Sequence, residues 1–436
     1  MPIPQHRAMS SRSLWPAVFA GLLVACATRP PVVHPAPPPP TPAPGTSAPP
    51  APAPSPRPPQ DLDAPRERDT RRMEERADMP RREASTRPPL PPPRPTPVGA
   101  NPNVEGDQAY ARVSVMFGTD RKLDPRTGSF GGGRGEWIAY GEVIVSVPHG
   151  HKTGEIEAPS IWRLEFREDP RKHMTILDWT PHTRMGFLKR VKAKVQAQGS
   201  SGSSFVFVHG YNVSFSDAAR RTAQITYDLD YRGVPVFYSW PSQGTLQGYT
   251  TDENNVQWSE ANLKRFLMDF AQKSGVKDIY LIAHSMGNRA LTGALRQLFT
   301  EQPKLKGRFK EIILTAPDID AEIFKRDIAP ALAAGCQRIT LYASDGDNAL
   351  LASKKVHGYP RAGDTAEGIV VVPGIETIDA SGLDTSFLEH SYFATAPPVI
   401  SDIRRVLQDG LRAARRGLEP HVAGAGSYWK LKGSKP

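Results

Sequence analysis

Cysteine is nearly absent from this sequence of 436 residues. Of its two cysteines, Cys26 ends an apolar run near the N-terminus and Cys336 stands alone in the part expected to fold. A disulfide between them would join a leader segment to a domain core, so we expect the mature domain to fold without disulfide support. The apolar run before Cys26 is too short to span a bilayer.

Long basic blocks and nucleic-acid motifs are also missing, although the net charge is +10. Scattered arginines and lysines favour weak attraction to anionic surfaces such as lipid headgroups or polyanionic glycans. Without an accompanying motif, the charge does not predict nucleic-acid binding. The run "GSFGGGRGE" lacks the pattern GxxxxGK[ST], so we interpret it as a hairpin loop and not as a phosphate-binding loop.

Proline is unevenly distributed, because more than half of the 45 prolines fall between Pro30 and Pro102. Large apolar residues are scarce there, and proline removes backbone hydrogen-bond donors, so residues 26–108 are predicted to form a disordered, proline-rich tether. Beyond it the composition is that of an ordinary globular protein. We expect a folded domain over residues 109–415 and a flexible C-terminal tail over residues 416–436.

Residues 1–25 have the pattern of a signal peptide: a basic segment, then "LWPAVFAGLLVA". The end of this segment, "LVAC", resembles a bacterial lipobox, with Leu23 three positions before Cys26. The resemblance implies that Cys26 becomes lipidated. Because Ala27 follows the cysteine in place of aspartate, it also implies sorting to the outer membrane of a bacterial cell envelope, facing either the periplasm or the surface.

The folded region alternates short apolar runs with segments of helical spacing, which predicts an α/β fold with a mostly parallel central sheet flanked by helices. Additional strands are expected before this alternation begins. The expected strands are 111–119, 136–148, 204–210, 234–240, 278–284, 311–317, 338–344 and 375–381, and the expected helices are 181–197, 215–230, 256–273, 288–300 and 320–334.

The segment "AHSMG" fits the small-x-Ser-x-Gly elbow between a strand and a helix, with Ala283 in place of the usual first glycine. Small flanking residues let the strand and helix approach each other. Ser285 then lies at the tip of a strained turn, beside a helix N-terminus that favours a developing anion. The pattern therefore predicts that Ser285 is a nucleophile.

A serine hydroxyl needs a base, and the base needs a carboxylate. In such folds the order along the chain is serine, acid, histidine. Asp347, past the strand 338–344, is the expected acid, and His390, after the last strand, is the expected base. Asp345 remains a close alternative as the acid. Asp318 is a third candidate, although we favour a helix N-cap there.

Two other histidines compete with His390 for the role of base. His284 adjoins the nucleophile, so the elbow turns its side chain away, and His357 precedes the last strand, out of order. The oxyanion of the reaction needs two donors. We expect them to be the backbone N–H groups of Met286 and of Tyr211 in "VFVHGYN", with the side chain of His209 supporting that loop.

Five segments in order, "TDR", "YGEVIVSVPHGHKTGEIE", "FVHGYNVSF", "SWPSQG" and "AHSMGN", resemble a bacterial α/β-hydrolase family of unknown function. The likeness covers about residues 111–393. It implies the α/β-hydrolase fold, with Ser285, an aspartate after the next-to-last strand and His390 carried over to this sequence. Ala283 departs from the general hydrolase pattern, though not from the pattern of this family. The resemblance implies no substrate.

Two further groups of residues suggest binding sites. His149 and His151 are two apart, with Glu155 beyond, a spacing compatible with a metal ligand pair. No third strong ligand cluster accompanies them, so we expect a structural turn, no metal and no cofactor. Trp240, Tyr249 and Asp252 follow a strand at its carboxyl end, where ligands bind in open sheets, so they are candidates to line a substrate cleft.

The sequence thus predicts an outer-membrane-anchored serine hydrolase of carboxylic esters or, secondarily, amides. Its substrate would be an ester-bearing small molecule or polymer. Because the helix expected after "APDID" begins almost at once, a large inserted cap is missing, and an open cleft for bulky acyl substrates is the hypothesis. The alternative is a non-catalytic surface scaffold or glycan-binding lipoprotein that retains the hydrolase frame.

Overall fold

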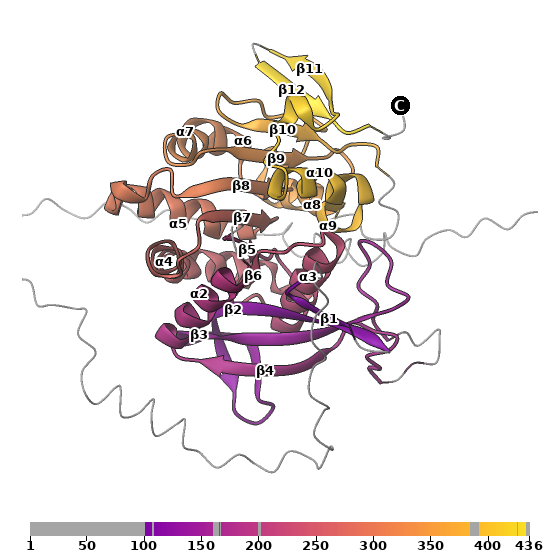
Figure 1. Cartoon of the computed structure of the whole chain (residues 1–436). Coiled ribbons are helices and arrows are strands. Elements are labelled where there is room, and N and C mark those ends of the chain that lie inside the picture. Colours follow the sequence, from indigo (N-terminus) through magenta and orange to yellow (C-terminus); the bar gives the residue numbers. More distant parts are fainter. Residues whose placement is uncertain are drawn as a thin grey trace, which may run out of the picture. The chain divides into compact units, whose positions relative to one another are not determined.

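One large sheet organises the folded part of the chain (Figure 1). Its strands follow the order β11-β12-β10-β9-β8-β7-β5-β6-β2-β3-β4, and β1 pairs with β2 off this path. The computed structural model describes residues 101–106, 109–159, 165, 167–198, 202–383, 392–424 and 426–432, with only the backbone at 348, 352, 392 and 393. The strands are β1 (Val104–Gly106), β2 (Tyr110–Asp124), β3 (Ser129–Pro148), β4 (Ile176–His182), β5 (Ser203–Val208), β6 (Val234–Ser239), β7 (Asp278–His284), β8 (Phe309–Thr315), β9 (Ile339–Ala343), β10 (Glu376–Asp379), β11 (Glu419–Ala423) and β12 (Gly426–Lys430).

The centre of this sheet is parallel, as the alternation of strands and helices predicts. Strands β2, β6, β5, β7, β8, β9 and β10 pair in parallel, and β12 pairs in parallel with β10. Antiparallel pairs occur among β1 to β4 and between β11 and β12. The carboxyl ends of the central strands therefore meet at one edge, where the loops that carry Ser285 and Tyr211 emerge.

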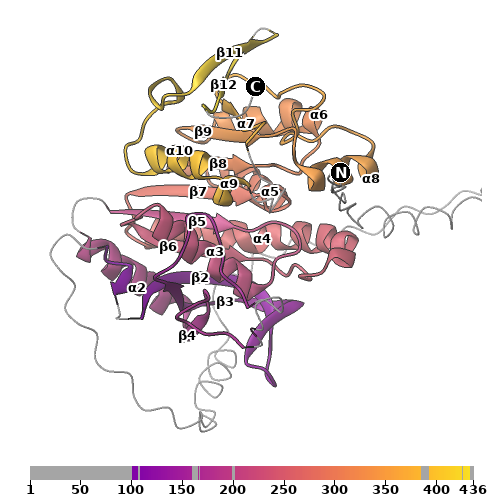
Figure 2. The ribbon, with the colours of Figure 1, turned by 90° about the vertical axis from the view of Figure 1, so that its right-hand side faces the viewer.

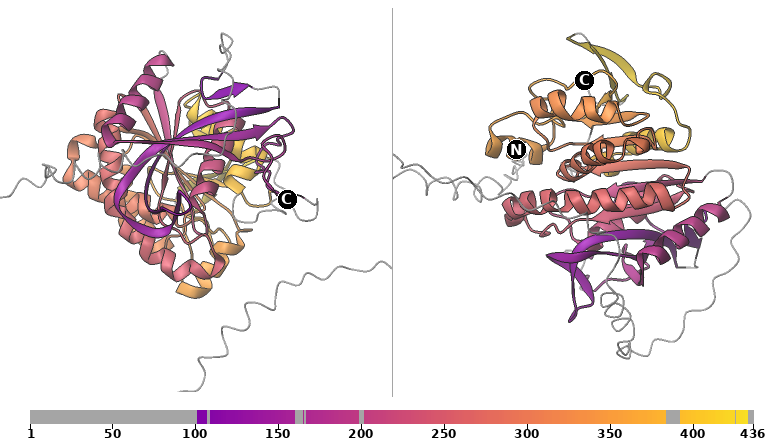
Figure 3. Two further views of the ribbon diagram at one scale, coloured as in Figure 1. Left: turned by 90° about the horizontal axis from the view of Figure 1, so that it is seen from below. Right: turned by 90° about the vertical axis from the view of Figure 1, so that its left-hand side faces the viewer.

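Helices cover both faces of the sheet, and Figure 1 shows α2, α4, α5 and α7 on one side with α3 and α10 on the other. Figures 2 and 3 show the same layers from other directions. The expected helix 256–273 begins earlier in the structure, and the expected helix 320–334 is interrupted by a π-turn. The α-helices are α2 (Arg184–Ala197), α3 (Phe215–Asp228), α4 (Tyr249–Lys273), α5 (Gly287–Glu301), α6 (Ala321–Ile323), α7 (Ala329–Ala333), α8 (Asn348–His357), α9 (Tyr392–Thr395) and α10 (Pro397–Leu407), with short turns η3 (Leu246–Gly248), η4 (Pro303–Leu305), η5 (Phe324–Ile328) and η6 (Ala413–Arg415).

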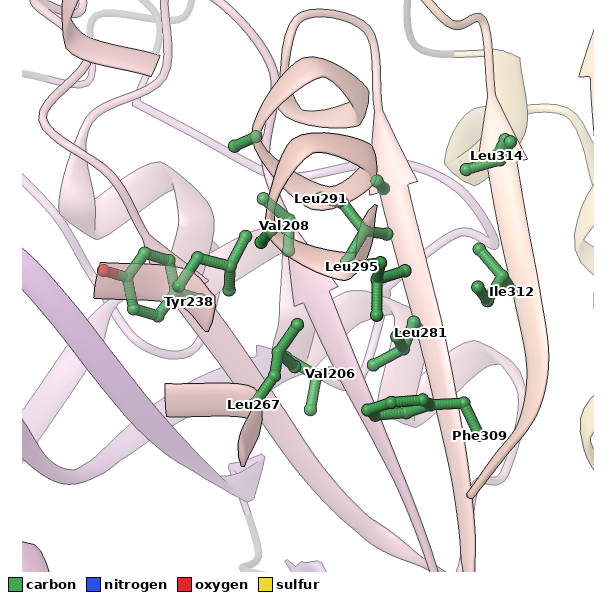
Figure 4. Packing of buried hydrophobic residues seen from close by; sticks show 14 of the residues in the cluster. Val206, Val208, Tyr238, Leu267, Leu281, Leu291, Leu295, Phe309, Ile312 and Leu314 are labelled. Atoms are coloured by element: carbon green, nitrogen blue, oxygen red, sulfur yellow. The ribbon is translucent and has the colours of Figure 1, made fainter. Parts of the chain in front are cut away.

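Two hydrophobic clusters, one on each face, follow from the two-residue period of the strands. In β5, Val206 and Val208 point into the cluster under α2, α4 and α5, while Phe205 and Phe207 point into the cluster under α3 and α10. Figure 4 shows the first cluster, where Leu281 of β7 packs beneath α5. Because the strands are covered on both faces, they appear in the sequence as nearly continuous apolar runs.

The glycine-rich run after β2 is a strand and not the hairpin loop that the sequence suggests. Strand β3 starts at Ser129 and pairs with β2 through this run, with Arg134 opposite Arg121. The turn itself occupies residues 125–128. At Gly135 a Cβ would lie 2.8 Å from the backbone oxygen of Arg121, so the glycine permits close pairing of the two strands.

The folded domain extends further in both directions than the expected residues 109–415. Asn103 is buried, and its amide donates to the carbonyl oxygens of Tyr231 and Gly233. At the other end, the tail expected over residues 416–436 instead contains β11 and β12, which join the sheet beside β10. Among the described residues, no helix combines the length and the apolar composition needed to cross a membrane.

Candidate active site

Ser285 lies at the tip of a tight turn between β7 and α5, as the elbow pattern predicts. Its backbone has φ +50°, a left-handed conformation that non-glycine residues rarely adopt. Gly287 opens α5 so close to the neighbouring strand β5 that a Cβ there would lie 2.2 Å from the carbonyl oxygen of His209. The glycine is therefore needed for this approach, whereas the methyl group of Ala283 is accommodated within the core.

Hydrogen bonds hold the elbow in this conformation. The N–H of Ser285 donates to the carbonyl oxygen of Thr315, 3.0 Å away at the end of β8. The side-chain amide of Asn288 donates to the carbonyl oxygens of both Ser285 (2.9 Å) and Thr315 (3.1 Å). Asn288 is completely buried, so these bonds are shielded from water and keep the serine in place.

The loop after β5 lies directly against the nucleophile. A Cβ on Gly210 would lie 2.9 Å from the Cβ of Ser285 and 2.9 Å from the Nδ1 atom of His284. The backbone of residues 210–211 therefore passes beside the serine. No hydrogen bond among the described residues occupies the N–H of Tyr211 or of Met286, so both amides remain compatible with the predicted role of oxyanion donors.

A buried network supports this loop from behind. His209 Nδ1 donates to the carbonyl oxygen of Gly210 (2.8 Å), and its Nε2 is 3.0 Å from the Ser239 hydroxyl. Burial, together with the nearby Arg121 guanidinium, lowers the pKa of His209 to about 3. The imidazole is therefore neutral, and it props the loop as the sequence analysis expects.

Arg121, the last residue of "TDR", has a structural role that the sequence did not reveal. Its guanidinium donates to the Ser239 hydroxyl (2.8 Å) and to the carbonyl oxygens of Ser242 (2.8 Å) and Val213 (2.7 Å). Burial lowers the pKa of Arg121 to about 10, so it stays charged at neutral pH. One arginine thereby joins β2, β6 and the loops that follow β5 and β6.

The three residues expected to line a cleft lie in different environments. Trp240 is completely buried, stacks on His209 and donates to its carbonyl oxygen (2.7 Å), so its indole supports the loop and does not line an open cleft. Asp252 is also buried, and its carboxylate accepts from Ser242 (2.6 Å). Tyr249 is half-buried, with its ring 5.1 Å from the ring of Tyr211.

Asp347 is buried after β9, where the expected acid should lie. Its Oδ1 atom accepts the N–H groups of Ala349 (3.1 Å) and Leu350 (3.0 Å), so it is the N-cap of α8. These bonds fix the carboxyl group at the strand edge. Asp345 is exposed.

Asp318 is not the helix cap that the sequence suggested, because Asp320 caps α6. Instead its buried carboxylate is bound by Arg289 (2.8 Å) and Arg361 (3.1 Å) and accepts from Ser353 (2.5 Å). Despite burial, the two arginines hold the pKa of Asp318 below its usual value. A carboxylate so fully engaged is a structural anchor.

His390, the expected base, lies outside the described residues. The two competing histidines are both described. His284 is buried beside Gly210. His357 ends α8, where its Nε2 lies 2.6 Å from Glu253 and its Nδ1 donates to the carbonyl oxygen of Ser353 (2.7 Å).

The histidine pair after β3 does not act as a joint ligand pair in the structure. His149 is exposed, whereas His151 is buried between the carboxylates of Glu157 and Asp228, each 2.9 Å away. Among the described residues, no group of three or more metal-binding side chains is arranged to hold an ion.

A mostly parallel sheet with helices on both faces, a serine at a left-handed elbow and a glycine loop beside it define the class of α/β hydrolases. The chain belongs to the family described as "Alpha/beta hydrolase of unknown function (DUF900)", which its sequence matches over residues 188–409. The family resemblance noted in the sequence is thereby confirmed.

Several solved structures are similar to this chain at low identity and low TM-score. One is lipase B of Aspergillus fumigatus, with 10% identity and a TM-score of 0.31 over 48% of this chain and 54% of the lipase. Another is carboxylesterase CesB of Bacillus subtilis, with 10% identity and a TM-score of 0.29 over 51% of this chain and 98% of the carboxylesterase. A third is a Trichoderma reesei cutinase in complex with a phosphonate inhibitor, with 15% identity and a TM-score of 0.24 over 37% of this chain and 75% of the cutinase. The chain thus spans about half the length of the Aspergillus lipase. A search of curated proteins finds no match to this sequence.

Proposed function

We propose that this protein is a serine hydrolase of carboxylic esters that acts through an acyl-enzyme on Ser285. The observation that carries the proposal is the left-handed backbone of Ser285, with the loop of Gly210 and Tyr211 against it. Strain of this kind persists only where the surrounding structure enforces it, and it is typical of nucleophiles at active sites.

The reaction follows from the roles of the side chains. Ser285 Oγ attacks the ester carbonyl carbon, His390 takes the hydroxyl proton, and the carboxylate of Asp347 stabilises the resulting imidazolium. The N–H groups of Tyr211 and Met286 bind the oxyanion. The carbon–oxygen bond to the alcohol then breaks, and His390 protonates the departing alkoxide. Water, activated by His390, attacks the acyl-enzyme and releases the carboxylic acid and the free serine.

The short connection after β8 supports the proposed substrate class. Helix α6 begins at Ala321, six residues after β8 ends at Thr315, so this connection holds no large cap. A site that this connection leaves uncovered accepts esters on bulky or polymeric carriers. Amides are a secondary substrate class, because amine leaving groups require stronger assistance from a general acid.

Labelling with a fluorophosphonate probe tests the nucleophile. The probe reacts with a serine activated by a base, so we expect the folded protein to be labelled, Ser285→Ala to lose the label and Ser216→Ala to keep it. Ser216 lies in the first turn of helix α3 and not at an elbow between a strand and a helix. A native protein without label, or a Ser285→Ala variant that keeps the label, would contradict the enzymatic proposal and favour a non-catalytic scaffold or glycan-binding lipoprotein.

We propose further that Cys26 is lipidated and anchors the protein to the outer membrane. The proposal rests on the lipobox-like "LVAC" and on Ala27 after it. In a bacterial host grown with a clickable palmitate analogue, the wild type should acquire the label and fractionate with outer membranes. Cys26→Ser should lose both properties, whereas Cys336→Ser should retain them. A labelled Cys26→Ser variant would exclude this anchor.

A further inference from the structure

A groove of about 480 Å³ lies between α4, the first turns of α5 and the end of α8. Its volume lies in the range of sites for small molecules. Its lining is mostly polar, whereas pockets for acyl chains are mostly apolar. The lining residues are Glu253, Asn254, Val256, Gln257, Glu260, Arg289 and His357.

The charges near α5 neutralise one another. Glu253 Oε1 accepts from Arg289 (2.7 Å) and lies 2.6 Å from His357 Nε2. The Arg289 guanidinium also binds the carboxylate of Asp318 (2.8 Å). This side of the groove therefore presents fixed, compensated hydrogen-bonding groups and no excess positive charge for an anionic ligand.

Glu260 occupies the other side of the groove in an unusual environment. It is half-buried against α5, where Gly293 makes room for it: a Cβ at Gly293 would lie 2.4 Å from the carboxyl carbon of Glu260. Among the described residues it forms no ion pair, and the side-chain amide of Gln297 donates a hydrogen bond to it at 3.3 Å. Burial raises the pKa of Glu260 to about 7, so near neutral pH it both donates and accepts hydrogen bonds.

A row of packed aromatic side chains connects the wall of the groove to the loop beside the elbow. The ring of Tyr211, next to the nucleophile, lies 5.1 Å from the ring of Tyr249, and this ring lies 6.0 Å from His357 at the groove. Arg289 lies one helical turn beyond Ser285, and its guanidinium donates to the Tyr249 hydroxyl (3.2 Å). The groove therefore lies on the side of the elbow where Tyr249 packs.

We propose that this groove binds the carbohydrate part of the ester that Ser285 cleaves, an inference that rests on the proposed function. Carboxyl, amide, guanidinium and imidazole groups together offer donors and acceptors that match the hydroxyl groups of a sugar. The side chains of Val256 and His357 add apolar contact for the ring carbons. The absence of uncompensated charge near Arg289 favours a neutral sugar over a polyanion.

Two substrates with the same acyl group test this proposal in the full chain. One is a tetramer of N-acetylglucosamine that carries an added O-acetyl ester, and the other is 4-nitrophenyl acetate. For Glu260→Ala and for the exposed Gln257→Ala, we expect kcat/KM to fall roughly five-fold more on the tetramer than on 4-nitrophenyl acetate, mostly through KM, because a lost hydrogen bond weakens binding by this order. Glu301→Ala, on α5 outside the groove, should change neither value.

Equal effects on both substrates, in both groove variants, would overturn the proposal. Calorimetry with the tetramer that lacks the added ester gives an independent measurement in the Ser285→Ala background. We expect the tetramer to bind and its affinity to fall when Glu260→Ala is added. If the tetramer does not bind, or binds equally well with this change, the proposal for the groove is also overturned. A protein that hydrolyses neither substrate and is not labelled by the fluorophosphonate refutes the proposed function, and the calorimetric result then decides the groove alone.

Discussion

Ser285 holds a backbone conformation that costs a non-glycine residue roughly 1–3 kcal/mol. Three surrounding features offset this cost. Asn288 and the end of β8 bind the backbone of the elbow, and Gly287 brings α5 against β5. The strain places the hydroxyl at the strand edge, so the conformation and the proposed chemistry depend on the same small set of backbone contacts.

Gly287→Ala tests this dependence at a single methyl group. The new Cβ would meet the carbonyl oxygens of His209 (2.2 Å) and Val208 (2.8 Å), and neither backbone atom is free to rotate away. We expect a loss of about 1–3 kcal/mol in the free energy of unfolding. The displaced serine should also react with a fluorophosphonate about a hundredfold more slowly.

Chemical denaturation and the rate of labelling measure the two effects. Gly150→Ala is the matched control, because its Cβ would have no neighbour within 4 Å. If Gly287→Ala unfolds and reacts like the wild type, the close approach of α5 and β5 is not needed.

The elbow was predictable from the sequence because its determinants are consecutive: an apolar strand, a serine between small residues and a helix. The surroundings of Asp318 were not predictable, because its partners Arg289 and Arg361 are distant in the chain and converge only in the fold. Trp240 shows the same limit. Its position after a strand indicated the correct edge of the sheet, but not that the indole turns inward onto His209.

At the scale of elements, the imidazole of His151 connects the segment after β3 to the end of α3. His151 lies between Glu157 and Asp228, and the second carboxylate oxygen of Asp228 accepts the N–H of Gly154 (2.7 Å). Burial lowers the pKa of His151, but its hydrogen bonds to Asp228 and Glu157 outweigh burial and raise it to about 9. The segment is thus held by a charged histidine at neutral pH.

This arrangement makes the stability of the protein depend on pH. The folded-state pKa of His151 is raised above the ordinary 6.5, so its contribution is complete below pH 6.5 and is lost as the pH rises through about 9. Glu157 has a lowered pKa, so its contribution is lost only in acid, as the pH falls below 4.5. We expect His151→Gln to lower the melting temperature by several degrees between pH 5 and 6.5, and by progressively less up to pH 10.

His149→Gln provides the control, because this neighbouring histidine is exposed. Its melting temperature should follow that of the wild type at every pH. A deficit of His151→Gln that stays constant from pH 6 to pH 10 would show that the imidazole acts by shape and not by charge.

Most central strands were predictable as elements because burial on both faces leaves uninterrupted apolar runs in the sequence. The strands that were missed lack this signal. Strand β4 and strands β11 and β12 lie toward the ends of the sheet and carry polar and exposed residues. In β3, the glycine-rich run resembles a loop in the sequence, and one of its glycines, Gly135, is required by close contact with β2.

At the scale of the whole molecule, the C-terminal segment completes the sheet. Strand β12 pairs with β10, and beyond it Leu431 is 4% exposed within the cluster under α3 and α10. Arg416, wholly buried, forms ion pairs with Asp402 (3.4 Å) and Glu376 (3.6 Å). The C-terminal strands β11 and β12, up to Leu431, are therefore part of the domain that carries the elbow.

Leu431→Asp should therefore destabilise the entire domain. An unpaired carboxylate in this cluster, together with the lost apolar contact, should lower the free energy of unfolding by about 3 kcal/mol or more. The midpoint of urea denaturation measures the loss. In Val422→Asp the same change falls on a side chain that is 77% exposed, and the effect should stay within about 0.5 kcal/mol. Equal midpoints for both variants would mean that the C-terminal strands are dispensable.

The order of the sheet ends at β4 on one side and at β11 on the other. Each of these outermost strands contains a proline, Pro181 in β4 and Pro420 in β11. A proline fixes φ and removes one donor from the row that an incoming strand would need. At either edge of the sheet, the backbone is therefore poorly suited to continuous pairing with a strand of a neighbouring copy. This disfavours aggregation of crowded copies through their sheet edges.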